Sequence, residues 1–345
     1  MSVSLNLAAG QAFNERAFLE GFFTASAVAF GGHFMWKRVN QRDLLITPSA
    51  ITAAVPELPV RPAPDSFILT PIELKSTQPA RGIPTPAPVI EVTNNEKIII
   101  EDLSDQQVES YLRKTRNFDA VFASDIYLDL RYESLLLKTA ARLGRVESYI
   151  GHGNFNLMSF DEMLQSGRDF SYIGAFETDE LNFLEEIFFA NPNRYGFFGK
   201  KISKKITESI SRNDVAKIDN TGHYLLKGES LNLYEQIKRD VGAEVILTSG
   251  VRSIVKQMHL FLAKTIEANG NLSRASRSLA PPGHSYHGIG DFDIGKIGLG
   301  ERNFTADFST TEEYKKIAGL GYVDIRYPTD NLFGVRFEPW HIKIG

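Results

Sequence analysis

The sequence predicts an α+β C-terminal domain with a small, mainly antiparallel sheet and flanking helices, preceded by a helical region and a proline-rich linker. Three observations predict this organisation. Most of the prolines lie in one stretch, helical patterns dominate the segment after it, and short strand patterns alternate with helices in the last part. We therefore expect an N-terminal tail over 1–43, a linker over 44–96, a helical region over 97–200 and a folded domain over 201–345.

Composition is ordinary for a soluble globular protein, with 43% hydrophobic and 23% charged residues. The net charge of −4 gives no basic footprint, so no nucleic-acid partner is expected. The chain has no cysteine, which excludes disulfides, thiolate metal sites and cysteine nucleophiles. Such a chain suits export to an oxidising compartment.

The N-terminal tail contains a candidate membrane anchor, Ala17–Trp36. Twenty residues would span about 30 Å as a helix, the thickness of a hydrocarbon core. Glu20 and His33 weaken the apolar pattern, so an amphipathic helix on the membrane surface and a packed globular helix stay open. Most of the flanking positive charge follows the segment, which by the positive-inside tendency would leave its C-terminal side in the cytoplasm.

The linker carries ten of the fifteen prolines, between Pro48 and Pro88. Proline at this density precludes helices and sheet ladders and favours polyproline II, at about 3.1 Å per residue. We expect a spacer that holds the folded part away from a bilayer.

Helical signals dominate 97–200. Ser104 is a candidate N-cap for a helix reaching residue 116, and a helix from residue 131 is expected to stop at Gly144. Ser159 and Glu162 form a capping-box pattern, and an apolar helix from residue 178 should end before Pro192.

Helices and strands alternate in 201–345, without the glycine fingerprint of a dinucleotide-binding βαβ unit. The strands are expected in "AEVILTSG", "DFDIG", "YVDIRY" and "GVRFEPWHIKIG". A helix is expected in "SIVKQMHLFLAKTIEANG", and another is expected to begin at Ser309 or Thr310 and to end at Gly319.

Metal-capable side chains gather in two stretches of this domain, "GHSYHGIGDFDIG" and "FEPWHIKIG". A catalytic zinc takes three ligands from His, Asp and Glu, and His287, Asp293 and His341 would supply that set. Glu338 would then be free to act as a general base. In a strand Glu338 and His341 would point to opposite faces, but a bend at Pro339 could bring them together. Ordinary polar loops remain the alternative.

A second constellation lies in "TSGVRSIVKQ". Arg252 follows a strand and a turn, and Gln257 lies five residues later on the next helix. A guanidinium binds a carboxylate bidentately, as recognition of a peptide's C-terminus requires. A surface arginine at a helix start is the alternative.

Together "SGVRSIVKQ", "SYHGIGDFDIG" and "EPWH", in this order, resemble the VanY-like zinc D-alanyl-D-alanine carboxypeptidases, a group that shares its metal-site fold with Hedgehog domains. The resemblance spans roughly 216–345. It implies Zn²⁺ on His287, an aspartate and His341, with Glu338 as general base. It also implies substrate binding by Arg252, Gln257 and Ser285.

One departure concerns the aspartate. The family has it seven residues after the histidine, where this chain has Ile294. Alignment on "DIG" gives the ligand role to Asp293 rather than Asp291. His284 is off-pattern and is expected at the rim of the site.

From these motifs we expect a zinc metallopeptidase of the cell wall that hydrolyses the terminal D-Ala-D-Ala bond of peptidoglycan stem peptides. The alternatives are an endopeptidase for peptide cross-links and a non-catalytic wall-binding module on the same fold. The expected location is the cell envelope, in the periplasm, with a tether to the inner membrane through the N-terminal segment. The positive charges that follow this segment argue against that simple topology.

Overall fold

The structure is a computed structural model that describes residues 91–92, 98–99 and 105–344, all of which fall in one compact unit. The described residues do not include the predicted tail (1–43), with its candidate anchor Ala17–Trp36, or the predicted N-cap Ser104. Of the predicted linker (44–96) they include only Glu91–Val92. No helix within the described part is long and apolar enough to cross a membrane.

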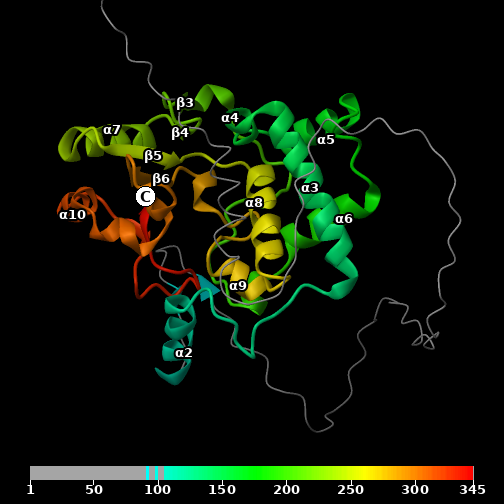
Figure 1. Ribbon diagram of the computed structural model, residues 1–345, viewed down its shortest axis with the longest axis horizontal. Helices are drawn as coiled ribbons and strands as arrows, with labels where there is room; N and C mark the ends of the chain where they lie inside the picture. The colour runs from blue at the N-terminus through cyan, green and yellow to red at the C-terminus, as the bar shows by residue number, and fades with distance from the viewer. Residues whose placement is uncertain (1–90, 93–97, 100–104, 345) are drawn as a thin grey trace, which may run out of the picture. The chain divides into compact units, whose positions relative to one another are not determined.

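Figure 1 shows the described helices and strands: α2 to α6 follow one another without a strand between them, and helices and strands are interspersed from β3 onward. The α-helices are α2 (Asp105–Arg116), α3 (Glu133–Ile150), α4 (His152–Phe155), α5 (Phe160–Asp169), α6 (Thr178–Phe189), α7 (Glu229–Val241), α8 (Ile254–Glu267), α9 (Leu272–Ser276) and α10 (Glu312–Ala318). The strands are β1 (Glu91–Val92), β2 (Ile98–Ile99), β3 (Val215–Lys217), β4 (Tyr224–Leu226), β5 (Val245–Ser249), β6 (Phe292–Lys296), β7 (Ile325–Tyr327) and β8 (Glu338–Ile342). Short 3₁₀ turns are η1 (Leu130–Tyr132), η2 (Pro192–Tyr195), η3 (Arg212–Asp214), η4 (Tyr286–Gly288), η5 (Gly300–Phe304) and η6 (Ala306–Thr310).

The predicted α+β class with a small antiparallel sheet is confirmed. Four strands form a sheet in the order β5-β6-β8-β7, with every neighbouring pair antiparallel, and β1-β2 and β3-β4 are separate antiparallel pairs. One face of the four-stranded sheet packs against α7 and α10. That cluster includes Ile237 from α7, Phe292 and Ile294 from β6, Ile317 from α10, and Trp340 and Ile342 from β8. The opposite face is therefore free to carry polar groups.

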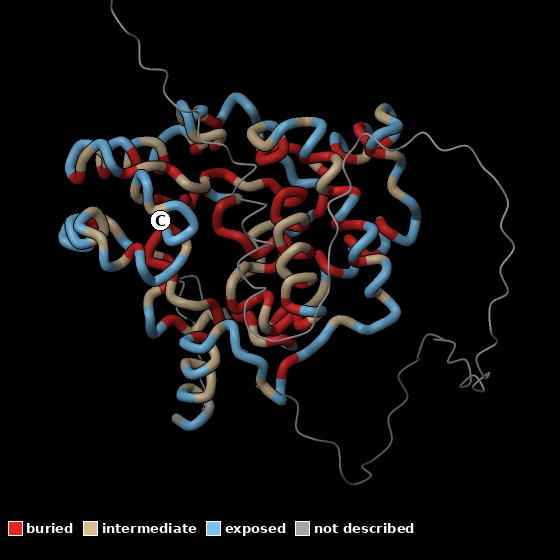
Figure 2. Tube along the Cα trace, viewed as in Figure 1, coloured by how far each residue is buried: buried red, intermediate tan, exposed pale blue. Residues whose placement is uncertain are grey.

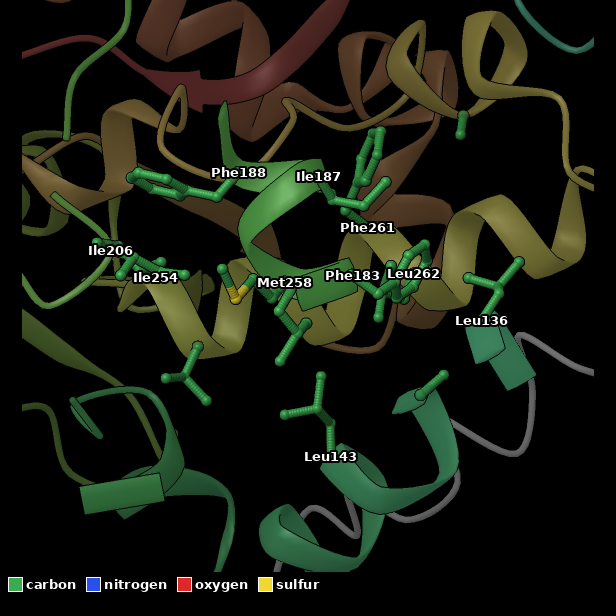
Figure 3. Packing of buried hydrophobic residues seen from close by; sticks show 14 of the residues in the cluster. Leu136, Leu143, Phe183, Ile187, Phe188, Ile206, Ile254, Met258, Phe261 and Leu262 are labelled. Carbon is green, nitrogen blue, oxygen red and sulfur yellow. The ribbon is translucent and has the colours of Figure 1, made fainter. Parts of the chain in front are cut away.

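The helical region and the last domain share one apolar core, centred on α8 (Figure 3). Leu143 of α3 and Phe183 of α6 belong to the same buried cluster as Met258 and Phe261 of α8. Figure 2 shows red, buried segments running from the strands into these helices. Because α8 begins right after Arg252, this core fixes the position of the predicted substrate-binding segment.

A buried polar network also joins the two regions. Glu147 of α3 accepts hydrogen bonds from Lys256 Nζ at 2.6 Å, His152 Nδ1 at 2.8 Å and His259 Nδ1 at 2.8 Å. Burial by itself would raise the pKa of Glu147, but these partners hold it far below its usual range. The carboxylate is therefore ionised and stabilises the contact between α3 and α8.

Most local expectations are confirmed, and two are wrong. Ser159 and Glu162 form the predicted capping box at the start of α5, and the apolar helix α6 ends before Pro192. The helix expected to stop at Gly144 continues to Ile150, because α3 buries apolar residues on both sides of that glycine against α8. The N-cap of α10 is Thr311, whose hydroxyl accepts from the Tyr314 amide, rather than Ser309 or Thr310.

Candidate metal centre

Asp293 and His341 face each other across neighbouring strands. Strand side chains alternate between the two faces of a sheet. Since Phe292 and Ile294 enter the apolar core, Asp293 between them points to the opposite face, and the same alternation applies to His341 in β8. The register pairs Asp293 directly with His341, whose Nδ1 lies 3.4 Å from Asp293 Oδ1. Both side chains are almost fully buried.

A bulge in β8 brings Glu338 to the same face as His341. Tyr327 pairs with Glu338 while Ile325 pairs with Ile342, so three residues of β7 lie opposite five of β8. The inserted residues break the alternation that would otherwise separate Glu338 from His341. Glu338 Oε2 lies 3.4 Å from His341 Nδ1, as the predicted bend at Pro339 requires.

His287 completes the cluster from the turn η4, between β6 and the preceding loop. Its Nδ1 bonds the Gly250 carbonyl oxygen at 2.8 Å, which leaves Nε2 directed at Asp293 Oδ2, 3.4 Å away. Gly250 can hold this carbonyl in place because its backbone lies against β4. A Cβ there would be 2.0 Å from the Tyr224 carbonyl oxygen, so a side chain at this position would displace the turn.

Behind His341 lies a second carboxylate, Asp291. His341 Nε2 is 3.1 Å from Asp291 Oδ2, and Arg326 forks onto both Asp291 oxygens at 2.8 and 3.0 Å. The backbone amide of Ile344 also donates to Asp291 at 2.8 Å. Burial alone would lower the pKa of His341, but Asp291, Glu338 and the neighbouring carboxylates raise it to about 9.

The donor set fits a zinc ion. One atom each from His287, Asp293 and His341 lies within 4.8 Å of the others. Asp293 Oδ1 is buried and makes no hydrogen bond, although a buried carboxylate oxygen normally has one. The second nitrogen of each imidazole is held by an oxygen acceptor, the outer-sphere arrangement typical of metal-binding histidines. Two imidazoles and one carboxylate match a catalytic zinc set.

The electrostatics of the cluster are those of a cation site. Burial would raise the pKa of Asp293, but His287, His341 and Arg252 lower it to about 2, so the carboxylate is ionised. Burial and the neighbouring Arg252 lower the pKa of His287, which keeps this imidazole neutral. An ionised carboxylate and a neutral imidazole are the protonation states that metal binding needs.

The structure brings Arg252 into the cluster, with Gln257 behind it. Arg252 Nη2 donates to Ser249 Oγ at 2.9 Å and to His287 Nε2 at 3.1 Å, while Nη1 donates to Gln257 Oε1 at 3.1 Å. The Gln257 amide nitrogen donates to the Ala280 carbonyl oxygen. Gln257 therefore orients the guanidinium. Ser285 is buried and directly precedes the turn that carries His287.

His284 does not join the cluster, and it is buried rather than at the rim. Its Nδ1 is within hydrogen-bonding distance of the carbonyl oxygens of Gly199 and Lys200, and burial lowers its pKa to about 4. Reasoning from sequence considered Asp291 only as the alternative ligand to Asp293 and did not predict its contact with His341. Asp291 and Asp293 are two residues apart, and residues at this spacing lie on the same face of an extended segment. The spacing therefore could have indicated that both carboxylates lie near His341.

Comparison with known proteins identifies the domain that holds this cluster. Residues 227–344 match the family model of VanY, D-alanyl-D-alanine carboxypeptidase. The predicted resemblance to this family is therefore confirmed over that range. No curated protein matches the sequence.

Three solved structures are similar to part of the chain. The LD-carboxypeptidase LdcB is 26% identical (TM-score 0.30), and the match covers 35% of this chain and 58% of that one. A variant of the vancomycin-resistance D,D-pentapeptidase VanY in complex with Zn(II) is 24% identical (TM-score 0.29), covering 37% and 76%. VanYB in complex with D-alanine-D-alanine is 22% identical (TM-score 0.32), covering 43% and 83%. The chain thus spans little more than half the length of LdcB.

Proposed function

With a VanY domain over residues 227–344 as the premise, we propose that this protein is a zinc-dependent D-alanyl-D-alanine carboxypeptidase acting on peptidoglycan stem peptides. The observation that carries the proposal is the convergence of His287, Asp293 and His341 next to a carboxylate, Glu338, that is not needed as a ligand. A catalytic zinc site has three protein ligands and an open position for water, and a carboxylate beside that position can serve as general base, which a non-catalytic site does not need.

In this proposal His287, Asp293 and His341 hold the zinc ion. When bound, zinc supplies a Lewis acid that polarises the scissile carbonyl and lowers the pKa of an attacking water. Glu338 accepts the proton of that water and passes it to the leaving amine, since its carboxylate already faces the cluster. Asp291 keeps His341 in the tautomer and orientation that direct Nδ1 inward.

Arg252 is the proposed receptor for the terminal carboxylate, with Gln257 and Ser285 as its neighbours in the substrate site. The guanidinium is held by Gln257 and Ser249 on one side and reaches the ligand atoms of His287 and Asp293 on the other. A terminal carboxylate bound there would place the last peptide bond close to the cluster. This arrangement favours removal of a single terminal residue over cleavage within a cross-link.

We further propose that the protein works in the cell envelope, on the periplasmic side, tethered by the segment 17–36. The support is the sequence alone, namely the apolar segment followed by a proline-rich spacer.

The test uses the full-length protein, its zinc content and the release of D-alanine from a stem pentapeptide. Stoichiometric zinc and D-alanine release are expected, with kcat lowered about 10²- to 10⁴-fold in Glu338→Ala. Glu301→Ala, an exposed glutamate on η5, is the matched control and should retain activity. Cleavage of cross-linked peptides without D-alanine release would favour the endopeptidase. Zinc without either activity would favour a wall-binding module.

A further inference from the structure

A second arginine, Arg336, lies on the other side of Glu338 from the metal ligands. Glu338 Oε2 faces His341, whereas Glu338 Oε1 lies 3.8 Å from Arg336 Nε. Arg252, by contrast, contacts His287 and Asp293. Arg252 therefore approaches the cluster at two metal ligands and Arg336 approaches it at the proposed general base, so a peptide bound over the cluster would come within reach of both.

The Arg336 guanidinium is held in place but is poorly supplied with acceptors. Its Nη2 donates to the Phe304 carbonyl oxygen at 3.1 Å, which is the only hydrogen bond of this guanidinium within the described part of the chain. Its Nε is buried and makes none. A guanidinium has five N–H donors, and a buried donor without an acceptor is costly. The separation of 3.8 Å from Glu338 is too long for a hydrogen bond.

Two aromatic rings lie close to this guanidinium. It lies 4.5 Å from the ring centroid of Phe118 and 5.0 Å from that of Trp340. Contacts of this kind stabilise the cation through its plane and leave the N–H groups at its edge free. An open guanidinium edge accommodates a carboxylate, because two parallel N–H donors match its two oxygens.

The segment that supplies Phe118 lies outside the residues that match the VanY model. Arg277 anchors it by donating to the Phe118 carbonyl oxygen at 2.9 Å and by pairing with Asp125 at 2.8 Å. The backbone amide of Arg336 in turn donates to the Arg277 carbonyl oxygen at 2.8 Å. The helical region of this chain thus packs against Arg336, the neighbour of Glu338.

We propose that Arg336 is a second carboxylate receptor of the site and helps determine which stem peptides are accepted. This inference rests on the proposed function. The carboxylate has two sources in a stem peptide: the C-terminus, or a side chain on the residue before the D-alanine pair. Both offer the same chemistry to the guanidinium, so the experiment has to separate them.

The experiment compares kcat/KM of the zinc-loaded protein and of Arg336→Gln on three stem pentapeptides. The first has diaminopimelate at its third position, the second has lysine, which lacks only the side-chain carboxylate, and the third is the diaminopimelate peptide with a C-terminal amide. Loss of a charge-assisted pair should cost about 10- to 100-fold on peptides that keep the recognised carboxylate and little on the peptide that lacks it. Which peptide escapes the loss identifies the source.

An equal loss on all three peptides would overturn the inference, because it would mean that Arg336 acts only through Glu338 or the fold. Arg302→Gln, which removes an exposed arginine paired with Asp307, is the control and should leave all three values unchanged. If Arg336→Gln does not fold, Arg336→Lys serves instead. It keeps the charge but loses the planar fork, so a smaller loss with the same dependence on substrate is expected.

Calorimetric binding of the stem tetrapeptide, the product of the proposed reaction, separates this inference from the proposed function. It uses the acid and amide forms and the diaminopimelate and lysine forms. If Arg336→Gln binds more weakly only those peptides that carry one particular carboxylate, Arg336 is a receptor for that carboxylate, even if no D-alanine is ever released. If the affinity is the same with and without either carboxylate, and the same for the wild type and Arg336→Gln, the inference about Arg336 is wrong whatever the catalytic result.

Discussion

Asp291 and Asp293 lie two residues apart, and we expect their replacement by asparagine to have different main effects. Asp291→Asn should cause the larger loss of unfolding free energy, and Asp293→Asn should cause the larger loss of zinc affinity. Asp291 accepts four hydrogen bonds, two from Arg326 and one each from His341 and the Ile344 amide. Asp293 accepts a single long one, from Arg252 at 3.5 Å, and its Oδ1 accepts none. Asp291 therefore contributes mainly to stability, and Asp293 mainly to metal binding.

For Asp291→Asn we expect the metal-free protein to lose about 3 to 5 kcal/mol of unfolding free energy, since a buried arginine loses its carboxylate. The lower end is expected, because Arg326 also donates to the Ile344 carbonyl oxygen and lies over the Tyr286 ring. Zinc affinity should fall about 10- to 100-fold, as for other outer-sphere carboxylates. For Asp293→Asn the stability loss should be smaller, and the loss of zinc affinity should exceed 100-fold.

Urea denaturation of the metal-free variants and competition with a zinc chelator measure the two quantities. Asp324→Asn, at an exposed aspartate near the C-terminal strand, controls for the substitution itself. Wild-type zinc affinity in Asp293→Asn would refute the assignment of this residue as a ligand. A larger loss of zinc affinity in Asp291→Asn than in Asp293→Asn would give the ligand role to Asp291.

Three further predictions concern the surroundings of the site. Glu147→Gln should cost about 3 kcal/mol near pH 7, measured by urea denaturation, because Lys256 loses a buried carboxylate. Since the folded pKa of Glu147 is lowered, this contribution is present above pH 4.5 and is lost as the pH falls below that value, so the difference from the wild type should shrink in acid. Gly250→Ala should cost about 1 to 3 kcal/mol in the same assay and weaken zinc binding, because its Cβ would meet the Tyr224 carbonyl oxygen. Zinc affinity should rise about tenfold per pH unit between pH 6 and 8, measured by chelator competition, because His341, whose pKa the neighbouring carboxylates raise to about 9, must lose a proton before the metal binds.

Each of these predictions has its own control and its own contrary outcome. Glu109→Gln removes an exposed ion pair and should cost well under 1 kcal/mol, and a pH-independent cost of Glu147→Gln would contradict the linkage. Gly321→Ala, where a Cβ meets nothing, should be neutral, and Gly250→Ala should not be. Zinc affinity that does not change with pH would mean that His341 is neutral in the metal-free protein.

The sequence by itself determined the local structure and the chemistry of the inner cluster. Period-2 alternation located the strands around Asp293 and His341, and the capping box at Ser159 located the start of a helix. These features depend on residues within a few positions of each other, so their signal survives in a linear pattern. The ordered motifs likewise singled out His287, which lies within the range 227–344 that matches the VanY model.

Only the tertiary structure decided which groups support that cluster. The pairing of Asp291 with Arg326, the approach of Phe118 to Arg336 and the continuation of α3 through Gly144 all depend on contacts between distant segments. Burial and long-range packing outweigh local propensity at such positions, because a side chain's partners there are set by how elements pack and not by neighbours in sequence. The physical reason is that burial of apolar surface drives the packing of these elements, and which surface is buried depends on contacts that form only when the chain folds.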